Sequence, residues 1–532
     1  MLRWMVLACV AMMTLALRIS PAGEPALEKP YYIGAYLYTD RFAMAAAEQN
    51  RPMFDLFDEH FKKLSDVEIN CIHITIVDPD QFGQYVKLAE KYHIKLLPEL
   101  DFVYFRLHWS DQQMRENADR AIAFLKTWHD NPNILGWEVK EEPYDADIER
   151  LDRYFRMIIQ GVPQVKFIMV ASGGGWLSAN AADLPFSLVG GDYYYFSWEQ
   201  DLADKAYMRP PDVALRESRE TTELYRRASN KFGVPRIHVF GAAACTIPDR
   251  AQGFADGSGL PESWTAEQKE QYMQKVRQLA REQRQGWSVY ENVPGRDGPQ
   301  YNLWTLYMPP TNCIRALVWG SIMEGANVTM CFSYDPYSRK YNPDSPRDAV
   351  EHYRTERFYV DLAGRPDRPN EHFAEYAQTV KSVRSYEHIL SRLTIQPDSP
   401  LDGTLGDNFH ARAFAINGFD GRVLIVHNAN VGKILCADCR SKSLESCQHV
   451  VIDDHGELSD FIPQQTPNMS ALKLRPEMKN VGLWDISTGK MLPRKGSTWM
   501  ISINPGDGRL VYVGDAGSAK EIHRIYRPFA PN

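Results

Sequence analysis

The chain has 532 residues, of which 44% are hydrophobic, 24% charged and 12% aromatic, and its formal net charge is -8. This composition is that of a globular protein, and the length is ample for a barrel of about 250 residues together with a smaller domain. The charges are spread along the chain without a basic stripe, which excludes nucleic acid as an expected partner.

The N-terminal segment has the features of a secretory signal. Arg3 supplies a positive charge, residues 4–17 are apolar, and Ser20-Pro21-Ala22 offers a small-x-small cleavage site. We therefore expect residues 1–22 to be removed and the mature chain to be secreted or periplasmic, with an uncleaved anchor as the alternative. No later stretch of about 20 apolar residues exists, so we expect no membrane span in the mature chain.

Short β-rich runs recur along residues 30–392, and most are followed by a helical pattern. The runs lie at 31–38, 70–77, 94–102, 134–142, 165–171, 187–195, 235–243 and 328–334. They are nearly continuously apolar, as Ile72, Ile74 and Ile76 illustrate, which is typical of strands buried on both faces of a parallel sheet. Eight such units in series predict an α/β fold, a (β/α)8 TIM barrel, with an open doubly wound sheet as the alternative.

Two features of the barrel region bear on ligands. No glycine-rich phosphate-binding fingerprint follows the first run, so we predict no nucleotide and no other cofactor. A long insertion, residues 246–310, follows the seventh run, and part of it (265–285) has the pattern of a charged amphipathic helix. Because barrel active sites form at the βα loops, we interpret the insertion as a lid or subsite wall. A solvated decoration is the alternative.

After about residue 392 the pattern changes to short strands separated by turn signals such as Asn417-Gly418 and Asp420-Gly421. This pattern predicts a C-terminal all-β sandwich over residues 393–516, followed by a tail at 517–532.

The cysteines are too sparse for a disulfide scaffold in a chain of this size. Cys436, Cys439 and Cys447 form the one local cluster, with His449 beside it. A disulfide that pins a loop is the favoured interpretation. A zinc site is the less favoured alternative, because the second half of the cluster lacks a regular spacing of metal ligands. We predict no metal site elsewhere.

Acidic and aromatic residues gather where the predicted strands end, which is the catalytic face of a barrel. Carboxylates accept hydrogen bonds from sugar hydroxyls, and aromatic rings stack on the C–H faces of sugars, so we expect a carbohydrate substrate. The residues expected to bind it are Tyr38, Asp78, Glu99, Asp101, Trp176, Tyr194, Tyr334 and Asp335. Asp78 and Asp335 each precede a proline, and a turn is their alternative role.

Hydrolysis of a glycosidic bond needs two carboxyl groups, one to protonate the leaving oxygen and one to act as nucleophile or as base for a water. Glu141 and Glu142, followed by Pro143, end the fourth run. Adjacent residues of a regular strand point to opposite sides, so at most one of them should face the barrel axis. The partner carboxylate should then come from another strand. The first turn of a helix is the alternative interpretation of this triplet.

The segment 133–143 resembles the fourth strand of clan A glycoside hydrolases, in which a Glu before Pro acts as the acid/base. The resemblance implies this role for Glu142, with Glu141 at the position that the family usually gives to Asn. Residues 310–334 resemble the last helix and strand of these barrels, and residues 501–513 look like part of their C-terminal β-sandwich. The resemblance covers most of the mature chain, but only Glu142-Pro143 is a moderately specific motif.

The chain departs from this family at the seventh strand, where the family takes its nucleophilic Glu. Residues 240–245 contain no carboxylate. Three explanations stay open. The second carboxylate comes from elsewhere, with Asp192 first and then Glu99, Asp101 or Asp335. The strand count is wrong by one, which would promote a residue such as Glu291. Or the barrel lacks hydrolase activity.

The leading hypothesis is an exported glycoside hydrolase acting on a neutral or weakly charged glycan, with Glu142 as general acid/base and Glu141 raising its pKa. The alternative is a catalytically inactive barrel that binds carbohydrate or serves assembly. A metal-dependent hydrolase is a third hypothesis, which the scarcity of histidines at strand ends disfavours.

Overall fold

The computed structural model describes most of the barrel and of the C-terminal domain. The described residues are 31–143, 148–170, 184–193, 197–201, 206–208, 211–232, 234–241, 244–246, 265–267, 270, 288–290, 300–306, 309–334, 359–360, 371–403, 405–406, 408–434, 461–478 and 481–528. The expected signal segment, most of the helix expected at 265–285, and the cluster Cys436, Cys439 and Cys447 lie outside these ranges. Among the described cysteines, Cys71, Cys313 and Cys331 are buried.

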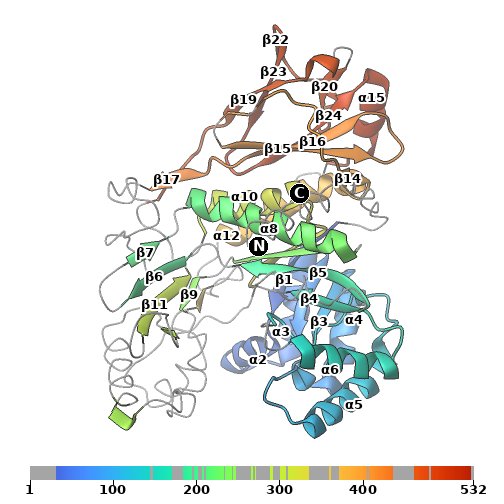
Figure 1. Ribbon diagram of the computed structural model, residues 1–532, viewed down its shortest axis with the longest axis vertical. Coiled ribbons are helices and arrows are strands. Elements are labelled where there is room, and N and C mark those ends of the chain that lie inside the picture. The colour runs from blue at the N-terminus through green and yellow to red at the C-terminus, as the bar shows by residue number, and fades with distance from the viewer. Residues whose placement is uncertain are drawn as a thin grey trace, which may run out of the picture.

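Parallel strands form the centre of the molecule (Figure 1). In the order in which they pair, these strands are β3 (Lys95–Glu99), β2 (Cys71–Thr75), β1 (Tyr32–Leu37), β12 (Val328–Phe332), β8 (Arg236–Gly241), β5 (Phe186–Tyr193) and β4 (Phe167–Val170). Residues 134–138 close the gap between β3 and β4, since Ile134 bridges Leu96 and Trp137 bridges Phe167, both in parallel. The sheet is therefore a closed eight-stranded barrel, which confirms the predicted fold class and rules out an open doubly wound sheet.

Closure also settles the strand count. β8 is the seventh strand along the chain and lies between β5 and β12, each of which pairs with it in parallel. The explanation that the count was wrong by one is therefore wrong, and the seventh strand does end without a carboxylate at Gly241.

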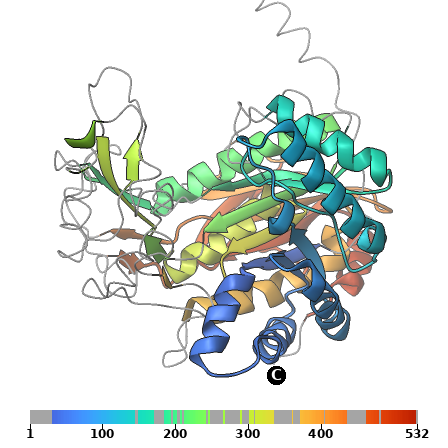
Figure 2. The ribbon, with the colours of Figure 1, turned by 90° about the horizontal axis from the view of Figure 1, so that it is seen from below.

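Helices surround the barrel on its outer face (Figure 2). They are α2 (Thr39–Glu48), α3 (Met53–Asp66), α4 (Phe82–Tyr92), α5 (Asp111–Trp128), α6 (Ile148–Gly161), α8 (Pro211–Phe232), α10 (Thr311–Met323), α12 (Glu371–Ser385) and α13 (Glu387–Leu390). Their starts follow local rules: a capping box at Ser110 and Gln113 begins α5, for example. Among the helices in the described ranges, none is long and apolar enough to cross a bilayer.

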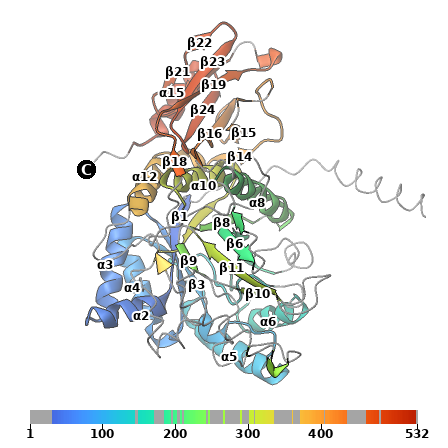
Figure 3. The same cartoon turned by 90° about the vertical axis from the view of Figure 1, so that its left-hand side faces the viewer.

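A second, antiparallel sheet lies beside the barrel (Figure 3). Its strands are β6 (Ser197–Asp201), β7 (Ala206–Met208), β9 (Ala244–Thr246), β10 (Ser288–Tyr290), β11 (Gln300–Leu306) and β13 (Tyr359–Val360). They come from the connections that follow β5, β8 and β12, so three βα connections fold together at the carboxyl end of the barrel. The expected insertion 246–310 supplies only part of this wall.

The C-terminal domain is built from antiparallel sheets. The larger one pairs β14 (Leu393–Ile395), β15 (Phe409–Ile416), β16 (Arg422–Asn428), β24 (Gly508–Gly514), β20 (Gly482–Asp485) and β21 (Lys490–Met491). A smaller sheet pairs β19 (Asn468–Lys473), β23 (Thr498–Ile503) and β22 (Arg494–Lys495), and a ribbon pairs β17 (Gly432–Ile434) with β18 (Phe461–Pro463). A hydrophobic core that includes Leu424, Val511, Leu472 and Ile501 joins the two larger sheets, as in a sandwich.

The other face of the larger sheet packs on the barrel helices, because Phe414, Ile425 and Leu510 belong to the same core cluster as Leu317 of α10. Residues expected to form only a tail begin with α15 (Ala516–Ile525), which is capped by Asp515 and docks through buried Ala519 and Ile522. The domain thus packs on the outside of the barrel, and Figure 1 shows it above α8, α10 and α12.

Candidate active site

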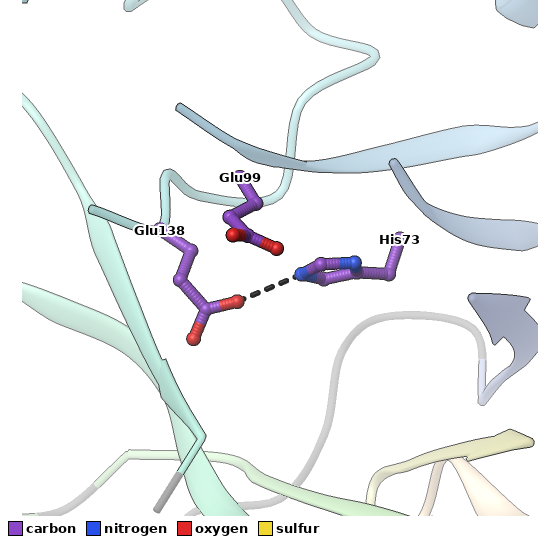
Figure 4. Close-up of side chains that lie close together, drawn as sticks. All are labelled: His73, Glu99 and Glu138. Atoms are coloured by element: carbon purple, nitrogen blue, oxygen red, sulfur yellow. Dashed lines mark hydrogen bonds and ion pairs between the residues drawn. The ribbon is translucent and has the colours of Figure 1, made fainter. Parts of the chain in front are cut away.

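The interior of the barrel changes from apolar to polar along its axis. Apolar side chains such as Leu188, Ile237 and Val328 form one interior cluster. Toward the carboxyl ends of neighbouring strands the interior residues become His73, Glu99 and Glu138, which are 0%, 7% and 0% exposed. Figure 4 shows the three side chains converging from three adjacent strands, with the His73 ring directed at the Glu138 carboxyl. The polar layer therefore forms the floor of the barrel mouth.

The floor is held by specific contacts. His73 Nε2 lies 2.7 Å from Glu138 Oε2, and the His73 ring stacks on Tyr36 with ring centroids 3.8 Å apart. Burial lowers the pKa of His73 to about 4, against the opposing charge of Glu99. Burial likewise raises the pKa of Glu138 to about 8. Both shifts favour a neutral pair at neutral pH, in which the Glu138 hydroxyl donates to His73 Nε2.

Glu99 shares this environment. Burial is the largest cause that raises its pKa to about 7, and the charges of Glu138 and Asp101 act in the same direction. Two carboxyl groups so close together in a buried layer cannot both be ionised cheaply. Near neutral pH the pair Glu99 and Glu138 therefore holds at least one proton.

The fourth strand is irregular just above this layer. Ile168 N–H donates to Trp137 O, as in a parallel ladder. If the ladder stayed regular beyond this point, the Glu141 N–H would donate to Val170 O. Instead Glu142 N–H donates to Val170 O, so the strand carries one extra residue, a β-bulge. The Val139 carbonyl, which a regular ladder would place on Val170 N–H, accepts from Phe105 N–H instead.

The bulge overturns the expectation based on regular alternation. Glu142 has φ +45°, a left-handed conformation that costs a non-glycine residue about 1 kcal/mol. Tyr104 fixes the residue before it, since its hydroxyl accepts from Glu141 N–H at 2.8 Å and donates to Glu141 O at 3.1 Å. The charge of Asp192 contributes to the raised pKa of both Glu141 and Glu142, so both carboxyl groups lie within its electrostatic reach.

Asp192 reaches the same place from β5. Leu188 lines the barrel interior, and residues two apart on a strand face the same side, so Asp192 also points inward, where it is 2% exposed. Its carboxyl group lies close enough to that of Glu142 for both its charge and a hydrogen bond to raise the pKa of Glu142. The charge of Asp192, then burial, then this hydrogen bond raise the pKa of Glu142 to about 9. The structure thus joins Glu142 to the residue that the sequence placed first among its candidate partners.

The remaining predicted binding residues divide into three groups. Tyr38 is half-buried, with Phe332 at its ring edge and Arg41 over its face, and Asp101 is half-buried beside Arg106 at 3.7 Å. Asp78 is exposed and accepts from Asp80 N–H at the start of the short helix η1 (Pro79–Gln81), which agrees with a turn role. Trp176, Tyr194 and Asp335 lie outside the described residues.

Tyr334 is a correction. Its ring is fully buried between Phe373 and His60, and its hydroxyl lies 2.9 Å from His60 Nδ1. The ring therefore has no face open to a sugar, and Tyr334 belongs to the packing between the barrel and its helices. The expectation failed because residue position at a strand end does not reveal on which side of the barrel wall a side chain lies.

Sequence reasoning missed His73 and Glu138. A signal was present, since each is an ionisable residue between two apolar neighbours inside a strand run. Together with Glu99 they could hold a metal ion, because one ligand atom from each lies within 4.8 Å of the others. The 2.7 Å contact already engages His73 Nε2 and Glu138 Oε2, so a cation bound through these two atoms would have to displace this hydrogen bond.

No family model matches the chain, and no curated protein does. Solved structures of glycoside hydrolases are similar to it over most of its length. An α-amylase from Anoxybacillus is 8% identical and covers 91% of this chain and 98% of its own, with a TM-score of 0.45. An α-amylase from Geobacillus thermoleovorans, solved with acarbose, is 9% identical, covers 92% and 100%, and has a TM-score of 0.45.

An endo-β-1,4-mannanase from Thermotoga petrophila is 10% identical and covers 90% of this chain and 98% of its own, with a TM-score of 0.38. These matches are remote in sequence and loose in structure, and the fold assignment rests on the closed strand order of the barrel. The chain is therefore a TIM barrel with a C-terminal β-domain, similar in outline to glycoside hydrolases.

Proposed function

We propose that this chain is an exported glycoside hydrolase in which Glu142 donates the proton to the leaving oxygen. One observation carries the proposal: Glu142 lies at the carboxyl end of a barrel strand, in hydrogen-bonding contact with Asp192, and its pKa is raised to about 9. A carboxyl group that keeps its proton at neutral pH is what a general acid requires. The Glu-Pro motif of the fourth strand supports the same assignment.

Asp192 has a different role from the one expected of a second catalytic carboxylate. The two carboxyl groups of a retaining enzyme stand about 5 Å apart, and those of an inverting enzyme about 6.5–9.5 Å. A carboxyl pair in direct hydrogen-bonding contact is closer than either. Asp192 therefore serves to keep the proton on Glu142, while Glu99, whose pKa of about 7 leaves it partly ionised at neutral pH, is the next candidate for nucleophile or base.

The charge of the mouth limits the substrate. Acidic groups dominate it: Glu99, Asp101, Glu138, Glu141, Glu142 and Asp192. The cations that act on them are Arg106 and Lys140. Such a site repels polyanionic glycans and accepts neutral or weakly charged ones. Secretion or periplasmic export, which the N-terminal segment predicts, would bring the enzyme to extracellular polysaccharide.

The test is a glycan panel incubated with the wild-type chain and with Glu142→Gln. We expect reducing sugar to appear with at least one neutral glycan, and the variant to lose activity by about 10²- to 10⁴-fold while its thermal unfolding stays unchanged. Undiminished hydrolysis by Glu142→Gln would sink the assignment of Glu142. The anomer first released, followed by NMR, then distinguishes retention from inversion.

A carbohydrate-binding barrel without turnover is the second candidate, and one specific observation favours it. The seventh strand, β8, ends at Gly241 and the sequence continues Ala242-Ala243-Ala244, with no carboxylate where related barrels carry their nucleophile. Glycan binding by calorimetry, without hydrolysis and with equal affinity in Glu142→Gln, is the outcome that selects this candidate over the first.

A further inference from the structure

One contact in the floor of the mouth replaces a missing backbone interaction. Val170 N–H would bond to Val139 O in a regular ladder, but the bulge diverts that carbonyl to Phe105. The Glu138 side chain takes its place, because Val170 N–H donates to Glu138 Oε1 at 3.3 Å. Val170 O in turn accepts from Glu142 N–H at 2.9 Å. The backbone of a single residue, Val170, therefore lies between the Glu138 carboxyl and the Glu142 backbone.

The Glu138 side chain is itself fixed from the other side. Its second oxygen lies 2.7 Å from His73 Nε2, the His73 ring stacks on Tyr36, and Phe332 meets Tyr36 edge to face at 5.9 Å. Glu138, His73 and Tyr36 are at most 1% exposed. Rotamers locked in this way by packing and hydrogen bonds are what holds a functional group within a fraction of an ångström.

We propose that Glu138, held by His73, is a positioning residue that stabilises the bulge and thereby keeps Glu142 against Asp192. The proposal deepens the proposed function and rests on it for its kinetic consequence. In this role Glu138 acts through the backbone of Val170. Its carboxyl satisfies a buried N–H that the bulge would otherwise leave without an acceptor, which costs about 1–3 kcal/mol.

Removal of this acceptor should therefore release the bulge. If Val170 N–H loses Glu138, the backbone can recover an acceptor only by returning Val139 O to the ladder. That shift removes the extra residue and brings Glu141 N–H, instead of Glu142 N–H, to Val170 O. Glu142 then leaves its left-handed conformation and its contact with Asp192, and the proton donor is displaced from the leaving oxygen.

The experiment compares Glu138→Met with Glu138→Gln. Met has a similar volume but no acceptor for Val170 N–H, whereas Gln keeps an oxygen there and an N–H for His73. A matched control is Glu324→Met, which removes another buried carboxyl, one bonded to Arg412 far from the mouth. His73→Phe, which keeps the stack on Tyr36 but not the hydrogen bond, serves as a second test if Glu138→Met fails to fold.

Steady-state kinetics, hydrogen exchange and melting temperature are measured on each folded variant. With the glycan that the wild type hydrolyses, we expect Glu138→Met to lower kcat about 10²-fold with KM changed less than about threefold, and Glu138→Gln to retain kcat within about fivefold. Hydrogen exchange of peptides covering residues 167–170 should accelerate in Glu138→Met and not in Glu138→Gln. Glu324→Met should lower the melting temperature and leave kcat and this exchange unchanged.

A further measurement, infrared spectroscopy of the Glu142 carboxyl group, does not depend on activity. The infrared band of the protonated Glu142 carboxyl is identified as the band that Glu142→Gln removes at pH 7. The proposal requires that Glu142→Gln remove no such band when it is made in the Glu138→Met background. In that background Glu142 lies away from Asp192 and is ionised, so it has no protonated band to lose. This readout separates the two proposals, since a wild type that hydrolyses no glycan refutes the proposed function but leaves the infrared and exchange arms decisive.

The positioning role is overturned if Glu138→Met keeps the Glu142 band and the exchange of residues 167–170. It is also overturned if Glu138→Gln loses kcat as severely as Glu138→Met without a change in exchange, because a direct chemical role of the carboxyl would then be the explanation. An intermediate loss of kcat in His73→Phe, with faster exchange, supports it.

Discussion

Buried carboxyl groups occur in two regions of this molecule, and their partners differ. At the base of the barrel Glu324, which follows α10, bonds to Arg412 of the C-terminal domain. Within that domain Asp485 lies 2.6 Å from Arg509. In the mouth the carboxyl groups of Glu99, Glu138, Glu142 and Asp192 have mainly one another and a neutral His73. Buried carboxyl groups are thus paired with arginine at the base of the barrel and in the C-terminal domain, and with one another where a ligand would bind.

The difference separates structural from functional acids. A buried carboxylate with an arginine partner is satisfied in every state of the protein, and its loss costs stability. Carboxyl groups that share protons instead hold pKa values far from their ordinary range, which is useful only if a proton is to be moved. Four predictions follow from this contrast, and each can break it.

The largest effect is expected when a Glu→Gln substitution is made in the mouth, at Glu142, and compared with the same substitution at the base of the barrel, at Glu324. Glu142→Gln should lower turnover about 10²- to 10⁴-fold with little change in stability, because the proton donor is removed but no ion pair is broken. Glu324→Gln should leave turnover unchanged and lower the free energy of unfolding by about 1–2 kcal/mol, since Arg412 loses the nearer of its two charged partners, Glu324 and Glu223. Kinetics and urea unfolding measure both, and the contrast fails if the two variants behave alike.

The next effect concerns the pH at which activity is lost. Glu142 must be protonated to act, so kcat/KM should fall as pH rises through its pKa of about 9. The charge of Asp192 is the largest cause of that raised value, and Asp192→Asn should therefore move the alkaline limb of the pH profile to lower pH. If the alkaline limb of the pH profile stays at the wild-type pH in Asp192→Asn, then a group other than Asp192 sets the pH of that limb.

Stability should depend on pH in the direction opposite to that of ordinary salt-bridged acids. The folded chain keeps protons on Glu138 and Glu142 up to about pH 8 and pH 9, whereas the unfolded chain loses them near pH 4.5. The folded state therefore binds more protons between these limits, and the free energy of unfolding falls as pH rises. We expect the melting temperature to drop by a few °C from pH 7 to pH 9, with a shallower drop in Glu142→Gln. A melting temperature that rises over this range would contradict the protonated mouth.

The smallest effect is expected from metal ions. Since His73 and Glu138 are hydrogen-bonded to each other, added Zn²⁺, Mn²⁺ or Ca²⁺ should shift the melting temperature by less than about 1 °C, and a chelator should not change activity. Stabilisation that disappears in His73→Phe would instead identify a metal site in the floor of the mouth. Glu99→Gln serves as the second variant, since it removes a different ligand of the same trio.

Much of the fold was predictable because it depends on local pattern. Near-continuous apolar runs such as that around Ile72 and Ile74 specify strands buried on both faces, and their number and alternation with helices specify a closed barrel. Local pattern could not show that residues 197–201, 206–208 and 359–360 would join the insertion after β8 in one sheet. Those pairings are long-range, and the short strands carry no signal of which partner they meet.

The site divides in the same way. The sequence by itself determined that Glu142 ends the fourth strand before a proline, that Asp192 lies at the end of the sixth, and that the seventh strand supplies no acid. Only the tertiary structure decided that the fourth strand carries one extra residue, that Glu138 and His73 support it, and that Glu142 meets Asp192. The physical reason is that a bulge changes which side chains face inward, and its stability comes from acceptors on neighbouring strands that are distant in the chain.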